Sequence, residues 1–134
     1  GQQQFIERPV PDEEEASTQD VRAWVLEHLD QRLSLRDLAA RANMSVRTFT
    51  RRFRAETGSS PTQWILDQRI DHARRLLERT DLPIERISSE AGFGSAVGLR
   101  AHFADAVGVS PSAYRRTFRA EHPAGGRPLM MRGG

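Results

Sequence analysis

Apolar residues recur along the centre of the chain at the three- and four-residue spacing of amphipathic helices, and no stretch alternates as a half-buried strand would. This pattern predicts an all-α domain. The first predicted helix carries its apolar stripe on Val21, Trp24, Val25 and Leu29. A second helix follows Ser34, which can cap it, and ends at Asn43.

A third predicted helix buries Phe49 and Phe53. Ser60 and Pro61 then open a long fourth helix, because a proline costs no hydrogen bond in the first helical turn. Its inward residues are Trp64, Ile65, Ile70, Ala73, Leu76 and Leu77. The helix ends near Thr80, and about eighteen residues at 1.5 Å each would span roughly 27 Å.

The pattern of residues 35–64 returns at residues 84–114. Leu35, Leu38 and Ala42 recur 49 positions on as Ile84, Ile87 and Ala91. After one inserted residue the offset is 50, and Phe49, Phe53, Gly58, Ser60, Pro61 and Trp64 recur as Leu99, Phe103, Gly108, Ser110, Pro111 and Tyr114. Each copy is a short helix, a tight turn and a second helix, which is the helix-turn-helix pattern. A helical-hairpin repeat that merely packs is the alternative.

The third predicted helix has an arginine face. On a wheel of about 100° per residue, Arg47, Arg51 and Arg54 lie opposite the two phenylalanines, with Thr50 beside them. Arginine can bond guanine O6 and N7 together, and threonine offers a hydroxyl or a methyl group, so these four residues are predicted base contacts. Arg52 lies on the flank and is a predicted phosphate contact. A solvated charged face is the alternative.

The matching helix of the second copy has an apolar outer strip formed by Val97, Ala101 and Ala104, with Arg100 adjacent. In a major groove, small side chains permit close backbone approach and contact thymine methyl groups, so this helix would read fewer hydrogen bonds and more shape. Gly98 costs about 1 kcal/mol relative to alanine within a helix, which close approach would explain. Contact with another protein is the alternative.

Four serines stand at predicted helix starts: Ser34, Ser45, Ser95 and Ser110. A helix start presents free amides and the positive end of the helix dipole, which phosphates accept readily. These serines are therefore predicted phosphate contacts, although most helix caps bind no phosphate.

Charge is unevenly divided along the chain. Residues 1–33 hold eight acids against three arginines and residues 34–134 ten against seventeen, so the two parts carry about −5 and +7. All twenty basic residues are arginine, which suits bidentate contacts to phosphate or guanine but also follows from a GC-rich coding genome. The basic part permits nucleic-acid binding without proving it.

Several function classes are disfavoured. The chain has no cysteine, which excludes disulfides and thiolate chemistry. Its histidines have no metal-ligand spacing and no nucleophile signature, so we expect no metal, cofactor or enzymatic activity; they are His28, His72, His102 and His122. The stretch GFGSAVG meets neither nucleotide-binding fingerprint. No apolar run has the length of a membrane span, and we expect a cytoplasmic, nucleoid-associated protein.

The two ends lack periodicity. Residues 1–17 combine glutamine, proline and an acidic run, and are predicted to form a flexible interdomain linker. Residues 121–134 carry proline and glycine at short intervals and are predicted to be a disordered tail.

With these residues in view, residues 21–120 resemble the AraC/XylS family of bacterial transcription activators. LRDLAARANMSVRTFTRRFRAETGSSPTQWI is similar to the family's first helix-turn-helix, and ERISSEAGFGSAVGLRAHFADAVGVSPSAYRRTF to its second half. The resemblance implies seven helices, in two helix-turn-helix subdomains joined by a long linker helix. It divides the DNA-binding domain, residues 18–120, into a first helix-turn-helix at about 34–57, a linker helix at about 61–80, a second helix-turn-helix at about 83–107 and a last helix at about 111–119.

The resemblance also implies a sequence-specific, DNA-binding transcription regulator whose recognition helices enter successive major grooves, roughly 34 Å apart. By this similarity base contacts come from Arg47, Thr50 and Arg51 and from Val97, Gly98, Arg100 and Ala101. Positions suited to phosphates hold Arg41, Arg52 and Arg115. Since other members carry polar residues on the second recognition helix, we expect the first unit to contribute more sequence discrimination.

The stretch GQQQFIERPVP resembles the junction in a subgroup with an N-terminal amidase or PfpI-like sensor domain. That would place effector binding and dimerisation outside this chain, and an activator would also contact RNA polymerase. The alternative function is a helical interaction module that binds polymerase or another regulator without reading DNA. Salt separates the two, because phosphate-dominated binding weakens steeply with salt.

Overall fold

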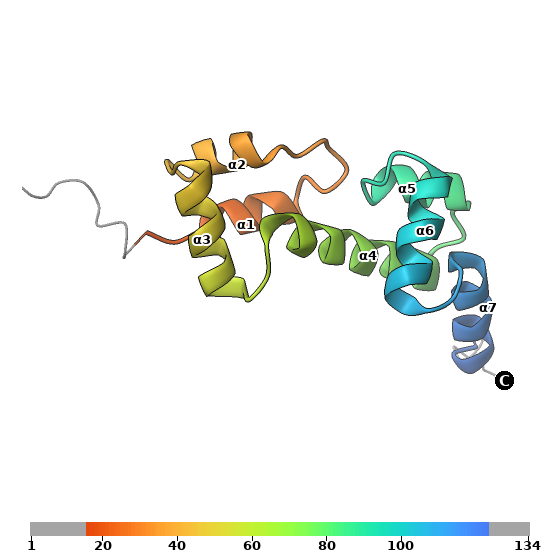
Figure 1. Ribbon diagram of the computed structural model, residues 1–134. Coiled ribbons are helices and arrows are strands. Elements are labelled where there is room, and N and C mark those ends of the chain that lie inside the picture. The colour runs from red at the N-terminus through yellow and green to blue at the C-terminus, as the bar shows by residue number, and fades with distance from the viewer. Residues whose placement is uncertain (1–15, 124–134) are drawn as a thin grey trace, which may run out of the picture. The chain divides into compact units, whose positions relative to one another are not determined.

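The computed structural model describes residues 16–123 of the chain. The helices are α1 Gln19–Leu26, α2 Leu35–Arg41, α3 Val46–Thr57, α4 Pro61–Arg79, α5 Ile84–Glu90, α6 Ala96–Val107 and α7 Pro111–Glu121 (Figure 1). No strand occurs in this range, which confirms the predicted all-α fold with seven helices. None of these helices is long and apolar enough to cross a membrane. Most of the predicted linker and tail lies outside the described residues.

The described chain forms two compact units. The first comprises residues 16–28 and 33–64, with α1, α2, α3 and the first turn of α4. The second comprises residues 29–32 and 65–123, with the rest of α4 and with α5, α6 and α7. Helix α4 therefore contributes residues to both units.

The first unit has a small core to which three helices contribute. Its most deeply buried apolar residues are Val21, Val25, Leu38, Ala39, Phe49 and Phe53. The Phe49 and Phe53 rings lie 5.5 Å apart, and the Phe53 ring meets Trp64 of α4 edge-on at 5.4 Å. This packing turns one side of α3 inward and leaves its other side exposed.

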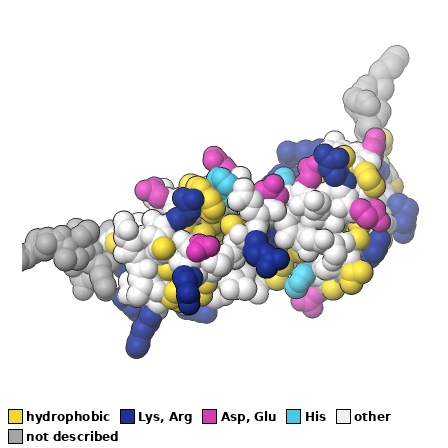
Figure 2. Space-filling view, turned by 90° about the horizontal axis from the view of Figure 1, so that it is seen from above, with side chains coloured by type: hydrophobic (Ala, Val, Ile, Leu, Met, Phe, Trp, Pro, Cys, Tyr) yellow, Lys and Arg dark blue, Asp and Glu magenta, His cyan; other side chains and the backbone are white. Residues whose placement is uncertain are grey.

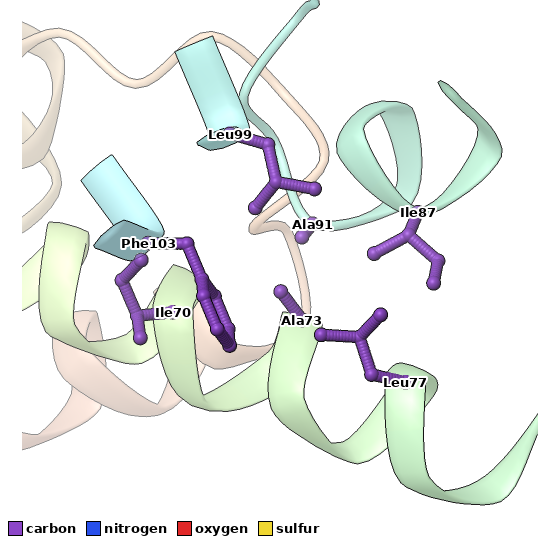
Figure 3. Packing of buried hydrophobic residues seen from close by; sticks show 7 residues of the cluster. All are labelled: Ile70, Ala73, Leu77, Ile87, Ala91, Leu99 and Phe103. Carbon is purple, nitrogen blue, oxygen red and sulfur yellow. The ribbon is translucent and has the colours of Figure 1, made fainter. Parts of the chain in front are cut away.

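The second unit has an equivalent core, in which side chains from α4, α5 and α6 point toward one another (Figure 3). The cluster consists of Ile70, Ala73, Leu77, Ile87, Ala91, Leu99 and Phe103. The Phe103 ring meets Tyr114 of α7 edge-on at 5.6 Å, which matches the contact of Phe53 with Trp64 in the first unit. The sequence repeat is therefore a repeat of packing geometry.

The predicted helix caps are confirmed. Backbone amides donate to the Oγ atoms of Ser34, Ser45, Ser95 and Ser110 at 3.0, 3.1, 3.0 and 3.1 Å. Ser60 caps α4 in the same way, at 3.2 Å. These bonds satisfy amides that the first helical turn leaves without partners.

The turns of the two copies repeat as well. Asn43 and Gly92, at matching positions between the short and the long helix, have φ of 57° and 90°. Gly58 and Gly108 end α3 and α6 with φ of 80° and 92°. Left-handed backbone suits glycine, and asparagine among other residues, which explains why the sequence breaks at these points.

Two predicted helix boundaries need correction. Helix α1 ends at Leu26, so Leu29 does not belong to it as the apolar spacing predicted. Leu29 is 6% exposed and is part of the second unit, where its carbonyl accepts a hydrogen bond from Arg69 Nε at 3.1 Å. The spacing was misleading because Leu29 is buried, but against the second unit. Helix α7 also continues to Glu121, into the predicted tail.

Candidate nucleic-acid interface

Helix α3 separates its apolar and cationic residues onto opposite sides. Phe49 and Phe53 are 0% and 1% exposed. The arginines predicted to contact bases are all exposed: Arg47, Arg51 and Arg54. Thr50 is half-buried beside them. Since the phenylalanines fix the rotation of the helix in the core, the arginines have no part in the core and face outward.

Helix α6 has the same inner face and a different outer face. Val97 is 74% exposed, and Arg100, Ala101 and Ala104 are also exposed. The Gly98 amide donates to Ser95 Oγ, and a Cβ at Gly98 would lie only 3.3 Å from that oxygen. The equivalent position of α3 is Thr48, which carries a side chain beside the same kind of cap, so the cap contact by itself does not require glycine here.

The outer faces of α3 and α6 correspond residue by residue. At an offset of 50, Arg47, Thr50, Arg51 and Arg54 align with Val97, Arg100, Ala101 and Ala104. Caps, terminal glycines and buried aromatic contacts are alike in the two units. The two helices therefore present different chemistry from equivalent positions.

Arginine side chains stand out on the surface in Figure 2, and acidic side chains lie among them. The surface charge in this view is mixed. Charge alone therefore does not outline an interface, and the helix faces define it better.

Arg41, at the end of α2, stacks its guanidinium on the indole of Trp24, with Cζ 3.7 Å from the ring centroid. His28 stacks on the same side chain, with ring centroids 4.0 Å apart and planes inclined by 13°. Stacking holds a guanidinium by its face and leaves the N–H edge for a phosphate. Sequence reasoning had found Arg41 but had not found Trp24 as its support.

Arg52 is bound within the chain. Its Nε and Nη2 donate to the carbonyl of Ala16 at 3.0 and 2.6 Å, and Nη2 also meets Glu56 Oε2 at 3.3 Å. The guanidinium therefore ties the residues before α1 to α3. The structure gives Arg52 this additional role, and its contact with phosphate stays a prediction.

Glu56 is the centre of a polar network that we call the Glu56 anchor: Ala16, Thr18, Arg22, Arg52 and Glu56. Glu56 Oε1 accepts hydrogen bonds from Thr18 N at 2.9 Å, from Thr18 Oγ1 at 2.7 Å and from Arg22 Nη2 at 3.1 Å. Thr18 is completely buried. Burial raises the pKa of Glu56, but the hydrogen bonds outweigh it and hold the pKa below its usual value.

Sequence reasoning missed the Glu56 anchor. Hydrophobic periodicity carries no information about a polar contact between residues 38 positions apart. The available sign was that Glu56 is the only acid of α3.

Arg115 of α7 is also bound within the chain, at the end of α4. It donates through Nε to the Leu77 carbonyl and through Nη2 to the Thr80 carbonyl, both at 3.1 Å. Arg119 Nη2 donates to the same Thr80 oxygen at 2.6 Å. The last carbonyls of a helix lack partners, so these arginines close α4. The predicted phosphate contact of Arg115 stays a prediction.

The four histidines have unrelated surroundings. His28 stacks on Trp24 and His122 on Phe118, and His102 lies near the Phe93 ring. Burial lowers the pKa of His72, and the charge of Arg75 lowers it further. Within residues 16–123, no three histidine or acidic side chains are grouped so that they could hold a metal ion.

A helix-turn-helix domain family of AraC type matches residues 38–117, which include both predicted recognition helices. The chain belongs to the AraC family. An AraC-type DNA-binding domain has two helix-turn-helix subdomains, and each of the two units described above contains one of them.

The relatives of this AraC-type domain are bacterial regulators. It is 36% identical over 99 residues to the MmsAB operon regulatory protein of Pseudomonas aeruginosa, covering 74% of this chain and 32% of that protein. It is 43% identical over 82 residues to the HTH-type transcriptional regulator Rv1931c of Mycobacterium tuberculosis, covering 61% and 32%. The chain therefore spans about a third of the length of these relatives.

Among solved structures, the DNA-binding domain of the global transcriptional factor AdpA, crystallised with a target DNA, is similar with a TM-score of 0.78 and 49% identity. The similarity covers 81% of this chain and 97% of that domain. The fold of the AraC-type domain is therefore shared over nearly the whole of a domain that has been seen on DNA.

Proposed function

We propose that this AraC-family chain is the DNA-binding module of a sequence-specific transcription regulator, with α3 and α6 each reading base edges in a major groove. The observation that carries the proposal is the repeated geometry of two serine-capped helices, each with a buried inner face and an outer face outside the core. The AdpA domain, which was crystallised with target DNA, supports it. The relatives that are transcription regulators support the regulatory role.

The base contacts that we propose lie on the two outer faces. On α3 they are Arg47, Thr50, Arg51 and Arg54, and on α6 they are Val97, Gly98, Arg100 and Ala101. Three arginines on α3 offer paired donors that match guanine O6 and N7, whereas α6 offers one arginine. The first unit therefore contributes more of the sequence discrimination.

The phosphate contacts that we propose begin with Arg41, whose stacked guanidinium has no hydrogen bond or ion pair within residues 16–123. The capping hydroxyls of Ser34, Ser45, Ser95 and Ser110 each retain a proton to donate. Arg52 and Arg115 have five N–H donors each and use only part of them within the chain, so they add secondary contacts.

We also propose that the intact regulator carries an N-terminal amidase or PfpI-like domain that binds the effector and dimerises. The resemblance of GQQQFIERPVP to such a junction supports this, as does the greater length of the relatives. In this proposal the chain contacts RNA polymerase, has no enzymatic activity, and acts in the cytoplasm at the nucleoid.

The test is selection of DNA from a randomised pool of about 24 base pairs, about two helical turns, by the full 134-residue chain. Arg51→Ala and Arg100→Ala are run beside it, at about 50 and about 200 mM salt. We expect a motif with two blocks about one turn apart, with each variant altering one block. Loss of a bidentate arginine contact reduces discrimination by about 1–3 kcal/mol.

The outcomes separate the alternatives. Equal loss of discrimination in both variants would contradict the leading role of the first unit. Retention without any sequence preference would contradict a sequence-specific regulator. Failure to retain DNA even at low salt would favour the helical protein-interaction module.

A further inference from the structure

We infer that α6 selects base pairs containing thymine, through an apolar strip that contacts thymine C5-methyl groups in the major groove. We call Val97, Ala101 and Ala104 the methyl strip. The inference rests on the proposed function and names the base that the second unit prefers.

The methyl strip has no part in the core of its own unit. Leu99 and Phe103 fill that core from α6 and are both 0% exposed, whereas Val97 is 74% exposed. A single exposed apolar side chain needs no explanation. Here three of the four residues that align with the outer face of α3 are apolar and exposed, the fourth being Arg100, and none of the three belongs to the core of the second unit.

The repeat indicates which partner the methyl strip has. Its three residues align with Arg47, Arg51 and Arg54, the outer face of α3. Both helices are held by the same cap and by the same edge-on aromatic contact, at 5.4 Å in the first unit and 5.6 Å in the second. The methyl strip of α6 therefore occupies the position that the arginine face of α3 occupies in the first unit. In the proposed function, each of these faces contacts base edges on the floor of a major groove.

The chemistry of the groove then favours thymine. Guanine presents two acceptors there, which valine and alanine would desolvate without giving a hydrogen bond. The thymine methyl is the apolar feature of the major-groove base edges. Arg100, an exposed cation beside the strip, is a proposed base contact of its own, so the preference for thymine applies to the base pairs that Val97, Ala101 and Ala104 contact.

The experiment compares two selections by the full chain, one from a randomised duplex pool made with thymidine and one from a pool made with deoxyuridine. Deoxyuridine removes only the C5-methyl group. We expect thymine to be enriched in one block of the motif selected from the thymidine pool. The deoxyuridine pool should show no preference for uracil at the same positions. Guanine in the other block is retained in both. In duplexes that carry a single binding site, each replacement of a contacted thymidine by deoxyuridine should weaken binding about fourfold. This is the effect of losing the burial of about one carbon group.

The matched variants are Val97→Thr and Val109→Thr. Threonine keeps the shape of valine and replaces one methyl group by a hydroxyl. Val109 is 44% exposed and lies between α6 and α7, outside the methyl strip. Because threonine retains one of the two methyl groups, Val97→Thr should lower the affinity ratio of thymidine to deoxyuridine duplexes at the position it contacts, and Val109→Thr should leave that ratio unchanged.

Three results would overturn the inference. An equal motif in both pools, with guanine still selected in the other block, would refute the methyl contact and leave the proposed function standing. Loss of preference for every base, guanine included, would refute both. If the strip binds a protein, Val97→Thr will leave the selected motif unaltered, which also counts against the inference.

Discussion

Four of the arginines predicted to contact DNA occupy three kinds of environment. Arg47 projects from the outer face of α3, and Arg41 lies flat on the indole of Trp24. Arg52 and Arg115 donate to backbone carbonyls. Sequence analysis predicted Arg47 as a base contact and the other three as phosphate contacts, but it could not find their contacts within the chain, because a guanidinium's partner is fixed by tertiary contacts. Position in the fold, and not residue type, therefore separates the arginines that we propose to read bases from those that hold the fold together.

Gly92 is the single residue whose replacement we expect to damage the second unit most directly. Its φ is +90°, and an added Cβ would lie 1.9 Å from the carbonyl oxygen of Leu29. Left-handed backbone costs an alanine about 1–2 kcal/mol, and the clash adds to this. We expect Gly92→Ala to lower the free energy of unfolding by more than about 2 kcal/mol, measured by urea denaturation of the full chain.

Gly94→Ala is the control for Gly92→Ala. Gly94 has a similar φ of +77°, but no atom lies within 4 Å of the position of its Cβ. The control therefore measures the cost of left-handed backbone alone, without the steric clash that Gly92→Ala adds. Equal destabilisation by the two substitutions would show that the residues 29–32 do not pass close to Gly92 in solution.

At the scale of helices, the sequence was informative wherever the signal was local. Periodicity, Ser caps and Ser-Pro starts define α2, α3, α6 and α7, because each depends on residues within one or two turns. The misplaced Leu29 and the unforeseen Glu56 anchor depend on residues that are distant along the chain. Burial of Leu29 within the second unit and a hydrogen bond from Thr18 to Glu56 leave no periodic mark.

The Glu56 anchor makes the stability of the first unit depend on pH. Because the pKa of Glu56 is lowered in the folded chain, the anchor stabilises fully above the unfolded value of about 4.5. That stabilisation is lost as the pH falls through the lower, folded value. We expect Glu56→Gln to be less stable than the parent chain near pH 6, and the difference to shrink toward about pH 3, in chemical denaturation followed at several pH values.

Glu27→Gln serves as the control for Glu56→Gln. Glu27 follows α1 in the same unit and is exposed. Its replacement should leave the pH profile of the parent chain unchanged. A Glu56→Gln variant with the same stability difference at every pH would contradict a charge-dependent anchor.

For the chain as a whole, a net charge of +2 hides the contrast between its parts. The duplicated units share a framework, yet one outer face carries three arginines and the other carries three apolar side chains and one arginine. The sequence predicted this asymmetry, because the outer positions follow from helical periodicity once the buried phenylalanines are identified. Binding by the whole chain should therefore combine a strongly salt-dependent part with a part that responds little to salt.

Salt dependence tests this expectation for the whole chain. The logarithm of the binding constant should fall linearly with the logarithm of salt concentration, with a slope of about −0.9 for each neutralised phosphate. Arg41→Gln should make this negative slope shallower by about one. It should also weaken binding to all DNA sequences by a similar factor. Fluorescence anisotropy titrations at several salt concentrations measure both quantities.

Arg79→Gln is the control for Arg41→Gln. Arg79 is an exposed arginine at the end of α4, outside both outer faces, and its loss removes the same charge. An equal reduction of the slope by both variants would mean that Arg41 acts through net charge and not through a defined phosphate.

The separation of inner and outer residues on α3 and α6 has a consequence for retargeting such a regulator. In each unit, the residues that fix the recognition helix differ from those on its outer face. Phe103 and Ser95 hold α6 in place, whereas Val97 is 74% exposed and can be replaced without opening a cavity. A library of variants confined to the outer positions of one helix should therefore alter one block of the recognised motif and leave the other block unchanged. The thermal stability of the chain should hardly change.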